Sequence, residues 1–236
     1  MNTARKQTLF RAGGIAALLA GILFRRNIGA EVDMFTVNDF PASVTDWFAL
    51  LQNKPFIGLS FLAIFDLVNY VLIGLMFFAL AVVLMRAHRK AAATALAIAL
   101  AGIAAGSIAN NALHMLSLSK QYAAASNVER AAIEAAGEAL LARDGASGAF
   151  QGSLITLSLF LIAAAVMIFA ILMLHSTAFG RVTATFGILA SALDLLYCLT
   201  VLFAPTLAVI LIAAAGLSYM IWHILVGVSL LKHKEL

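Results

Sequence analysis

An uninterrupted apolar run from Phe56 to Met85 constrains the fold more than any other feature of this chain of 236 residues. The run contains one charged side chain, Asp66, and a basic group from Arg86 to Lys90 follows it directly. About twenty apolar residues in a helix cross the hydrocarbon core of a bilayer. The run therefore predicts a membrane span that tilts or projects beyond the hydrocarbon.

The composition extends this prediction to the whole chain. Hydrophobic residues make up 64% and charged residues 11%, and the mean hydropathy is +1.03, far from the balance of soluble proteins. A chain with only three prolines and no short alternating segments favours helical spans over a β-barrel. The single cysteine, Cys198, excludes an intrachain disulfide and a cysteine-based zinc site.

The pattern of apolar runs predicts an all-α, polytopic membrane protein: a six-transmembrane-helix bundle with a short extramembranous helix, forming one domain over residues 1–236. The expected spans are 8–24, 56–85, 91–119, 149–174, 182–203 and 206–231. The first apolar run also fits a cleavable signal peptide, but Arg25 and Arg26 follow it at once, which favours a retained helix.

Two segments between the spans predict helices outside the hydrocarbon. Ser126 and Glu129 have the spacing of a capping box, and the alanine-rich sequence that follows predicts a helix to Arg143. Thr45 to Leu51 predicts a short capped helix whose aromatic edge lies on the membrane surface.

The distribution of charge predicts the orientation. The N-terminus, residues 86–90, residues 175–181 and the C-terminal tail hold nine lysines and arginines and one acid. The opposite loops hold six lysines and arginines and eight acids. Basic loops stay on the cytoplasmic side, so we expect an inner-membrane protein with both termini in the cytoplasm. The cations at span ends serve topology, and no nucleic-acid partner is expected.

Polar side chains recur at helical spacing within the spans, so that each group lies on one helix face. Groups of this kind on the last two spans include Cys198, Tyr219, Trp222 and His223. Counting from the span ends predicts that one set lines a cavity in the outer half of the bundle. This predicted site consists of Asp66, Asn69, Asn110, Asn111, His114, Asp194 and Tyr197.

The two intramembrane carboxylates, Asp66 and Asp194, are costly to insert and are therefore expected to face the bundle interior. They serve either a functional site or a hydrogen-bond network between helices. His114 could be a proton relay or a metal ligand, but the sequence lacks paired histidines and His-Glu-x-x-His. No metal and no cofactor are predicted. Gly102 and Gly106 form a GxxxG motif, which favours internal helix packing.

Short motifs along the chain resemble a bacterial family of six-span membrane proteins known as a domain of unknown function. They are Arg11-Ala-Gly13, Asp66, the turn from His175 to Arg181 leading into Gly187, and Trp222 to Gly227. The resemblance implies six spans and carries no activity or catalytic residue with it.

The leading functional hypothesis is that an intramembrane polar pocket, open toward the outer face, binds or transports a small or lipophilic molecule. The partners would then be the lipid bilayer and that ligand. A membrane-embedded enzyme, such as a lipid hydrolase that uses the aspartates and histidines, is the alternative class. A structural membrane subunit is the third.

Overall fold

The computed structural model describes residues 3–36, 41–143 and 153–233 of the chain. All regular structure in these ranges is α-helical, as predicted. The helices are α1 (Thr3–Thr36), α2 (Val44–Asn53), α3 (Pro55–Phe61), α4 (Ile64–Ala109), α5 (Ala112–Ala124), α6 (Asn127–Arg143), α7 (Ser153–Leu174), α8 (Arg181–Thr200) and α9 (Pro205–Lys232). Within this part of the chain, four helical stretches are long and apolar enough to cross a membrane: Ile64–Ala124, Leu154–Leu174, Arg181–Thr200 and Thr206–Lys232.

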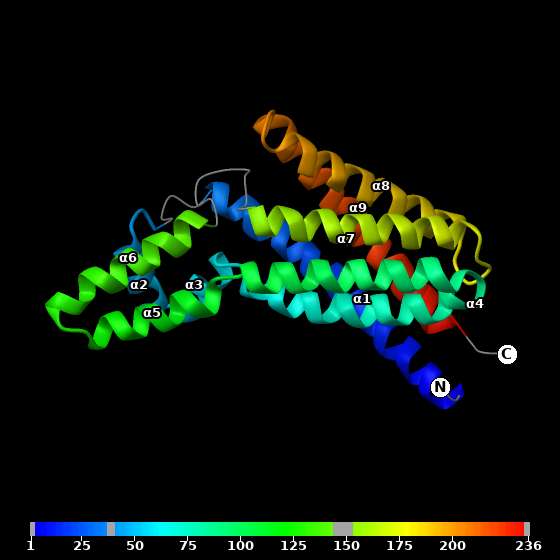
Figure 1. Cartoon of the computed structure of the whole chain (residues 1–236), viewed down its shortest axis with the longest axis horizontal. Helices are drawn as coiled ribbons and strands as arrows, with labels where there is room; N and C mark the ends of the chain where they lie inside the picture. Colours follow the sequence, from blue (N-terminus) through cyan, green and yellow to red (C-terminus); the bar gives the residue numbers. More distant parts are fainter. Residues whose placement is uncertain (1–2, 37–40, 144–152, 234–236) are drawn as a thin grey trace.

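Helix α4 is a hairpin of two arms that meet at His88. His88 has non-helical backbone angles, with φ −136° and ψ 65°, and the chain doubles back there (Figure 1). Gly106 of the second arm lies against the Tyr70 hydroxyl of the first arm, and a Cβ at Gly74 would lie 3.6 Å from Ile103. The arms are therefore antiparallel and in close contact along their length.

The two arms pack with α1, α7, α8 and α9 into an elongated bundle. The main pairings are α4 with α7, α1 with α9, α8 with both α7 and α9, and α1 with α4. Glycines bring α1 and α9 together, since a Cβ at Gly227 would lie 2.9 Å from the Gly14 carbonyl oxygen. Between α4 and α7, the buried rings of Phe77 and Phe169 stack at 5.7 Å.

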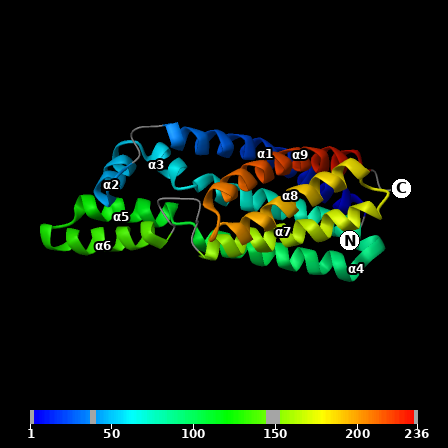
Figure 2. The same cartoon turned by 90° about the horizontal axis from the view of Figure 1, so that it is seen from above.

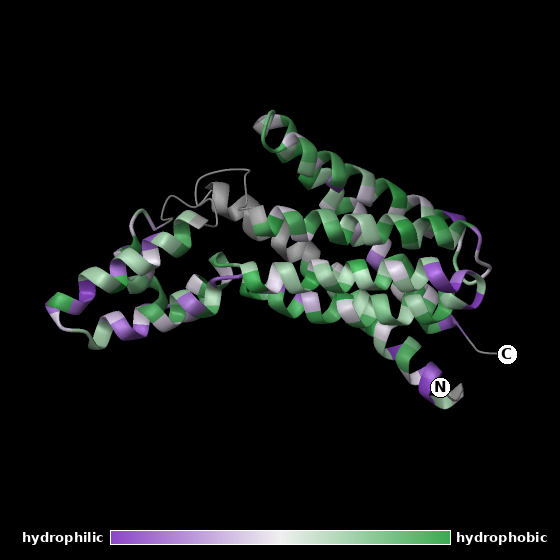
Figure 3. Ribbon diagram, viewed as in Figure 1, coloured by the Kyte–Doolittle hydropathy of each residue, from purple (hydrophilic) through white to green (hydrophobic). Residues whose placement is uncertain are grey.

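Most residues of the bundle helices are apolar, as the green ribbons of Figure 3 show, and many of their side chains face outward. Large side chains such as Ile22, Val71, Leu199 and Ile210 are each more than half exposed. A soluble protein rarely exposes so continuous an apolar surface. Together with the long apolar helices, this surface supports an integral membrane protein.

A smaller group of helices, α2, α3, α5 and α6, projects from one end of the bundle (Figure 2); we call it the helical extension. Its core contains Trp47, Phe48 and Leu51 of α2 and Met115 of α5, all buried. Helix α6 closes over them, because a Cβ at Gly137 would lie 2.8 Å from the Phe48 ring. The aromatic edge predicted to lie on the membrane surface is thus buried between helices.

The predicted spans 56–85 and 91–119 both run past the ends of the hairpin arms. Ala63 interrupts the first with left-handed angles, φ 57° and ψ 37°, and Asn110 interrupts the second in an extended conformation. The Asn110 amide donates to the Ala63 carbonyl at 2.8 Å, and its Oδ1 accepts the Ala112 N–H at 3.1 Å. The Asn110 side chain therefore stabilises the backbone at both helix breaks. Beyond each break the chain belongs to the helical extension.

The boundaries of the last three predicted spans that the structure describes lie close to those expected, whereas α1 runs well past its predicted end. Helices α8 and α9 each begin one residue before the predicted starts at 182 and 206, and α8 ends three residues before 203. Helix α7 ends at Leu174 as predicted, and its predicted start at 149 lies outside the described residues. Helix α1 contains 8–24 but continues to Thr36. Helix α6 covers the helix predicted from the capping box.

Candidate functional site

Residues of the predicted site lie at several places in the fold. Asp194 and Tyr197 are buried on α8, Asn69 is buried on α4, and Asp66 is half-buried in the first turn of α4. The remaining three, Asn110, Asn111 and His114, lie at the junction of α4 and α5 or on α5 itself.

The most enclosed polar side chains belong to α8 and α9, and we call them the α8–α9 polar cluster: Asp194, Tyr219, Trp222 and His223. Asp194 is 2% exposed and His223 3% exposed. The Asp194 carboxylate and the Tyr219 hydroxyl interact electrostatically across the helix pair. Asp194 is thirteen residues from the start of α8 and six from its end, so it lies in the second half of that helix, while Tyr219 lies near the middle of α9.

The three cluster residues of α9 have positions i, i+3 and i+4, which places them on one helix face. The Trp222 and His223 rings meet edge to face at 5.2 Å, and Tyr219 and His223 lie 6.1 Å apart. His223 Nδ1 lies 2.7 Å from the Tyr219 carbonyl oxygen. A carbonyl can only accept, so Nδ1 donates, and in the neutral imidazole Nε2 is then an acceptor.

Two polar atoms of this cluster have no hydrogen-bond partner among the described residues. They are Asp194 Oδ1, an acceptor, and Trp222 Nε1, a donor. Leaving a buried polar atom unpaired costs about 1–3 kcal/mol. Such atoms need water or a bound molecule as a partner. Asp194 can therefore offer a hydrogen-bond acceptor, and Trp222 a donor at a separate position, beside Gly187 of α8.

A second polar group joins the two arms of α4 to α7. Ser158 of α7 donates to the Gly102 carbonyl at 2.7 Å, and its hydroxyl also interacts with Tyr70. Asp66 interacts electrostatically with the same Tyr70. A Cβ at Gly102 would lie 2.8 Å from Ile162 of α7. The GxxxG motif thus serves internal helix packing, as predicted, and Asp66 and Asp194 belong to different groups of side chains.

The residues on α5 have other surroundings. The Asn111 amide donates to the Leu140 carbonyl of α6 at 3.4 Å, which ties the base of the extension together. His114 is exposed. Tyr197 is buried beside Val201 and Ala208. In the part of the chain that the structure describes, no three His, Cys, Asp or Glu side chains lie together as a metal site would require.

Some residues of these two polar groups could not be identified from the sequence. Ser158 stands in no recognisable motif in the sequence, and its role follows from its hydrogen bond to Gly102, 56 residues away in the chain. The spacing of Tyr219, Trp222 and His223 did indicate a common face, but the interaction of Tyr219 with Asp194 depends on how α8 and α9 pack. A comparison of the chain with family models, curated proteins and solved structures found no match.

Proposed function

We propose that this chain is a bacterial integral membrane protein that crosses the membrane six times. The crossings would be α1, the two arms of α4, α7, α8 and α9. An even number of crossings agrees with the start of α1 and the end of α9, which lie at the same end of the bundle (Figures 1 and 2). It also agrees with the family resemblance, which stays a prediction.

The proposed orientation leaves both termini in the cytoplasm of the cell, with the extension on the outer face of the inner membrane. The His88 bend and the turn between α7 and α8 lie at the same end, and His88 and His175 meet there edge to face at 6.2 Å. This end carries basic side chains at the start of α1, in the α4 bend, at Arg181 and at Lys232. Such an excess of basic residues favours the cytoplasmic side.

We further propose that the α8–α9 polar cluster binds or transports a small or lipophilic molecule. The observation that carries this proposal is the Asp194 carboxylate, which is 2% exposed and has one oxygen without a hydrogen-bond partner among the described residues. A carboxylate in a span is costly, and an unsatisfied one is more costly still. A ligand that donates to Asp194 would remove that cost.

Two other functions compete with this one. A membrane-embedded enzyme of the lipid-hydrolase class would use Asp194 and His223 as acid–base groups. A structural subunit would use the cluster only to hold α8 against α9. The three functions differ in whether a molecule is retained, whether it is converted, and whether the carboxylate charge is needed.

The test is to extract the small molecules that co-purify with the protein and to compare wild type with Asp194→Asn and Asp194→Leu by mass spectrometry. Asparagine preserves shape but removes the negative charge. We expect a species that wild type retains and that Asp194→Asn loses by about tenfold, the effect of one charge-assisted hydrogen bond. The thermal unfolding midpoint of the Asp194→Asn variant should stay close to that of wild type.

Three further variants complete the test. Glu138→Gln, at an exposed position on α6, controls for the loss of one negative charge. Asp66→Asn tests the prediction that both aspartates line one cavity, although the two lie in different groups of side chains. Identical extracts from wild type and Asp194→Asn, with instability only in Asp194→Leu, would establish the structural role and reject binding.

A further inference from the structure

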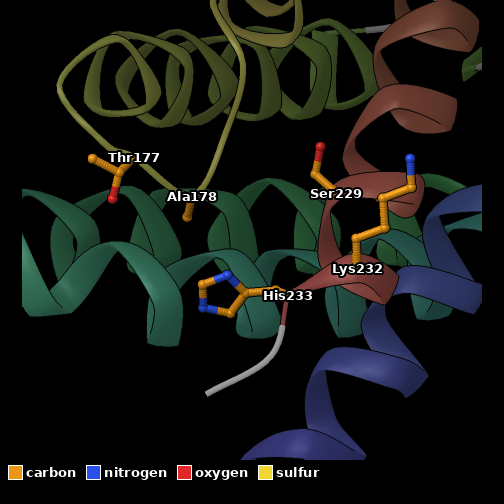
Figure 4. A pocket seen from close by; sticks show the side chains of 5 residues that line it. All are labelled: Thr177, Ala178, Ser229, Lys232 and His233. Atoms are coloured by element: carbon orange, nitrogen blue, oxygen red, sulfur yellow. The ribbon is translucent and has the colours of Figure 1, made fainter. Parts of the chain in front are cut away.

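A second site lies at the basic end of the bundle, far along α9 from the polar cluster. It is an open pocket of about 300 Å³ lined by Thr177, Ala178, Ser229, Lys232 and His233, shown in Figure 4. The first two residues belong to the turn between α7 and α8, and the others to the last turn of α9. Its volume is at the lower end of the range for small-ligand sites.

The lining combines the donors that bind phosphate. Lys232 is exposed and supplies an ammonium group, and Thr177 supplies a hydroxyl. The Ser229 hydroxyl already donates to the Leu225 carbonyl at 2.8 Å, so toward a ligand it can only accept. His233 packs its ring edge to face against Phe10 of α1 at 5.4 Å. Its Nε2 atom is buried and has no hydrogen-bond partner among the described residues. This imidazole nitrogen, in a pocket that a lysine also lines, is a buried polar atom that a bound ligand can satisfy.

The charges around the pocket favour an anion. Every acid whose side chain the structure describes lies either in the extension, as Asp46 and the glutamates of α6 do, or inside the bundle, as Asp66 and Asp194 do. Glu235 of the tail lies outside the described residues. Among the described side chains, none with a negative charge therefore competes for Lys232 at this end.

The surroundings of the pocket favour an anion that carries acyl chains. Leu174, Val228 and Leu231, which flank the pocket residues in sequence, are each between 38% and 44% exposed. Polar groups thus adjoin an apolar surface at the end of two long apolar helices, where lipid headgroups would lie. Basic pockets between helices on the cytoplasmic side suit the headgroups of anionic lipids.

We propose that this pocket binds a phosphate group, supplied by an anionic phospholipid of the adjoining leaflet or by a free phosphate ester. The phosphate would accept hydrogen bonds from Lys232, His233 and Thr177, and in the lipid case the acyl chains would lie on the apolar surface beside α7 and α9. This site is separate from the α8–α9 polar cluster and does not depend on its function.

Native mass spectrometry of the full-length protein in detergent tests the proposal. The probes are phosphatidylglycerol and phosphatidylcholine of equal chain length, each with and without inorganic phosphate as competitor. We expect preferential retention of phosphatidylglycerol, and a loss of about fivefold in its affinity for Lys232→Gln, the effect of one lysine near an anionic lipid. Lys232→Arg should keep most of the affinity, because it keeps the charge.

Lys90→Gln is the matched control, since Lys90 is exposed at the same end but does not line the pocket. Displacement of phosphatidylglycerol by inorganic phosphate, lost in Lys232→Gln, would support the pocket and add the free anion as a ligand. Binding of inorganic phosphate without lipid selectivity, again dependent on Lys232, would assign the site to a free phosphate ester. Equal retention of both lipids without phosphate binding, or equal losses in Lys232→Gln and Lys90→Gln, would overturn the proposal.

Discussion

The Asn110 side chain stabilises the fold through two hydrogen bonds, although it lies in an apolar run of the sequence. It donates to the Ala63 carbonyl and accepts the Ala112 N–H, so it joins the outer ends of both α4 arms. Asn110→Ala removes both hydrogen bonds. We expect a loss of about 1–2 kcal/mol in the free energy of unfolding, measured by chemical denaturation in detergent. Ser107→Ala, at an exposed position one turn earlier, should change stability little.

Ala63 has the left-handed backbone conformation in which residues other than glycine are strained. Valine is the harder substitution there, because its branched Cβ clashes with the backbone in this region. Ala63→Val should lower the free energy of unfolding by about 1–2 kcal/mol, whereas Ala63→Gly should be neutral or stabilising. Ala97→Val, in the regular helix of the second arm, is the control. Equal effects of valine at both positions would contradict the backbone assignment.

At the scale of elements, the start of α6 depends on the Glu129 carboxylate. It accepts hydrogen bonds from the Ser126 N–H at 2.9 Å and the Ser126 hydroxyl at 2.7 Å. These bonds lower the pKa of Glu129 below its usual value. Stability from this contact is therefore present above the usual glutamate pKa and is lost as the pH falls through the lowered pKa.

The pH dependence gives a direct measurement. Ser126→Ala removes the hydroxyl bond, the larger of the two causes, so the midpoint of the Glu129 carboxyl titration by NMR should rise. Ser117→Ala, on α5 and away from Glu129, should leave it in place. If Ser126→Ala leaves the Glu129 titration midpoint unchanged, the Ser126 hydroxyl does not stabilise the Glu129 carboxylate.

Helix boundaries were predictable where residues at the boundary itself determine it. They were missed where the boundary depends on contacts between residues distant in the sequence. Pro205 and the turn at Gly180 mark the starts of α9 and α8 in the sequence itself. The breaks at Ala63 and Asn110 depend on a hydrogen bond between residues 47 apart, which periodicity cannot reveal. The same holds for the candidate site: helical spacing found the α9 face, but its pairing with Asp194 arises from packing.

For the whole molecule, the orientation can be measured by labelling introduced cysteines in a Cys198→Ala background. A membrane-impermeant thiol reagent added to intact cells with a permeable outer membrane should label Ser126→Cys in the extension. It should not label Ala87→Cys in the α4 bend, because the basic end is expected in the cytoplasm. Both positions are exposed, so a reversed pattern would overturn the topology rather than reflect burial.

The composition of the helical extension imposes an order on biogenesis. Its apolar core joins α2, made early on the ribosome, to Met115 and α6, which emerge only after both arms of α4 have been translated. Trp47, Phe48 and Leu51 are therefore without their final neighbours while the 46 residues of the α4 hairpin enter the bilayer. Domains tend to fold as they are synthesised, and contacts distant in sequence form late. The extension can close only after the hairpin is in place, so its closure reports that insertion of the first half of the protein has succeeded.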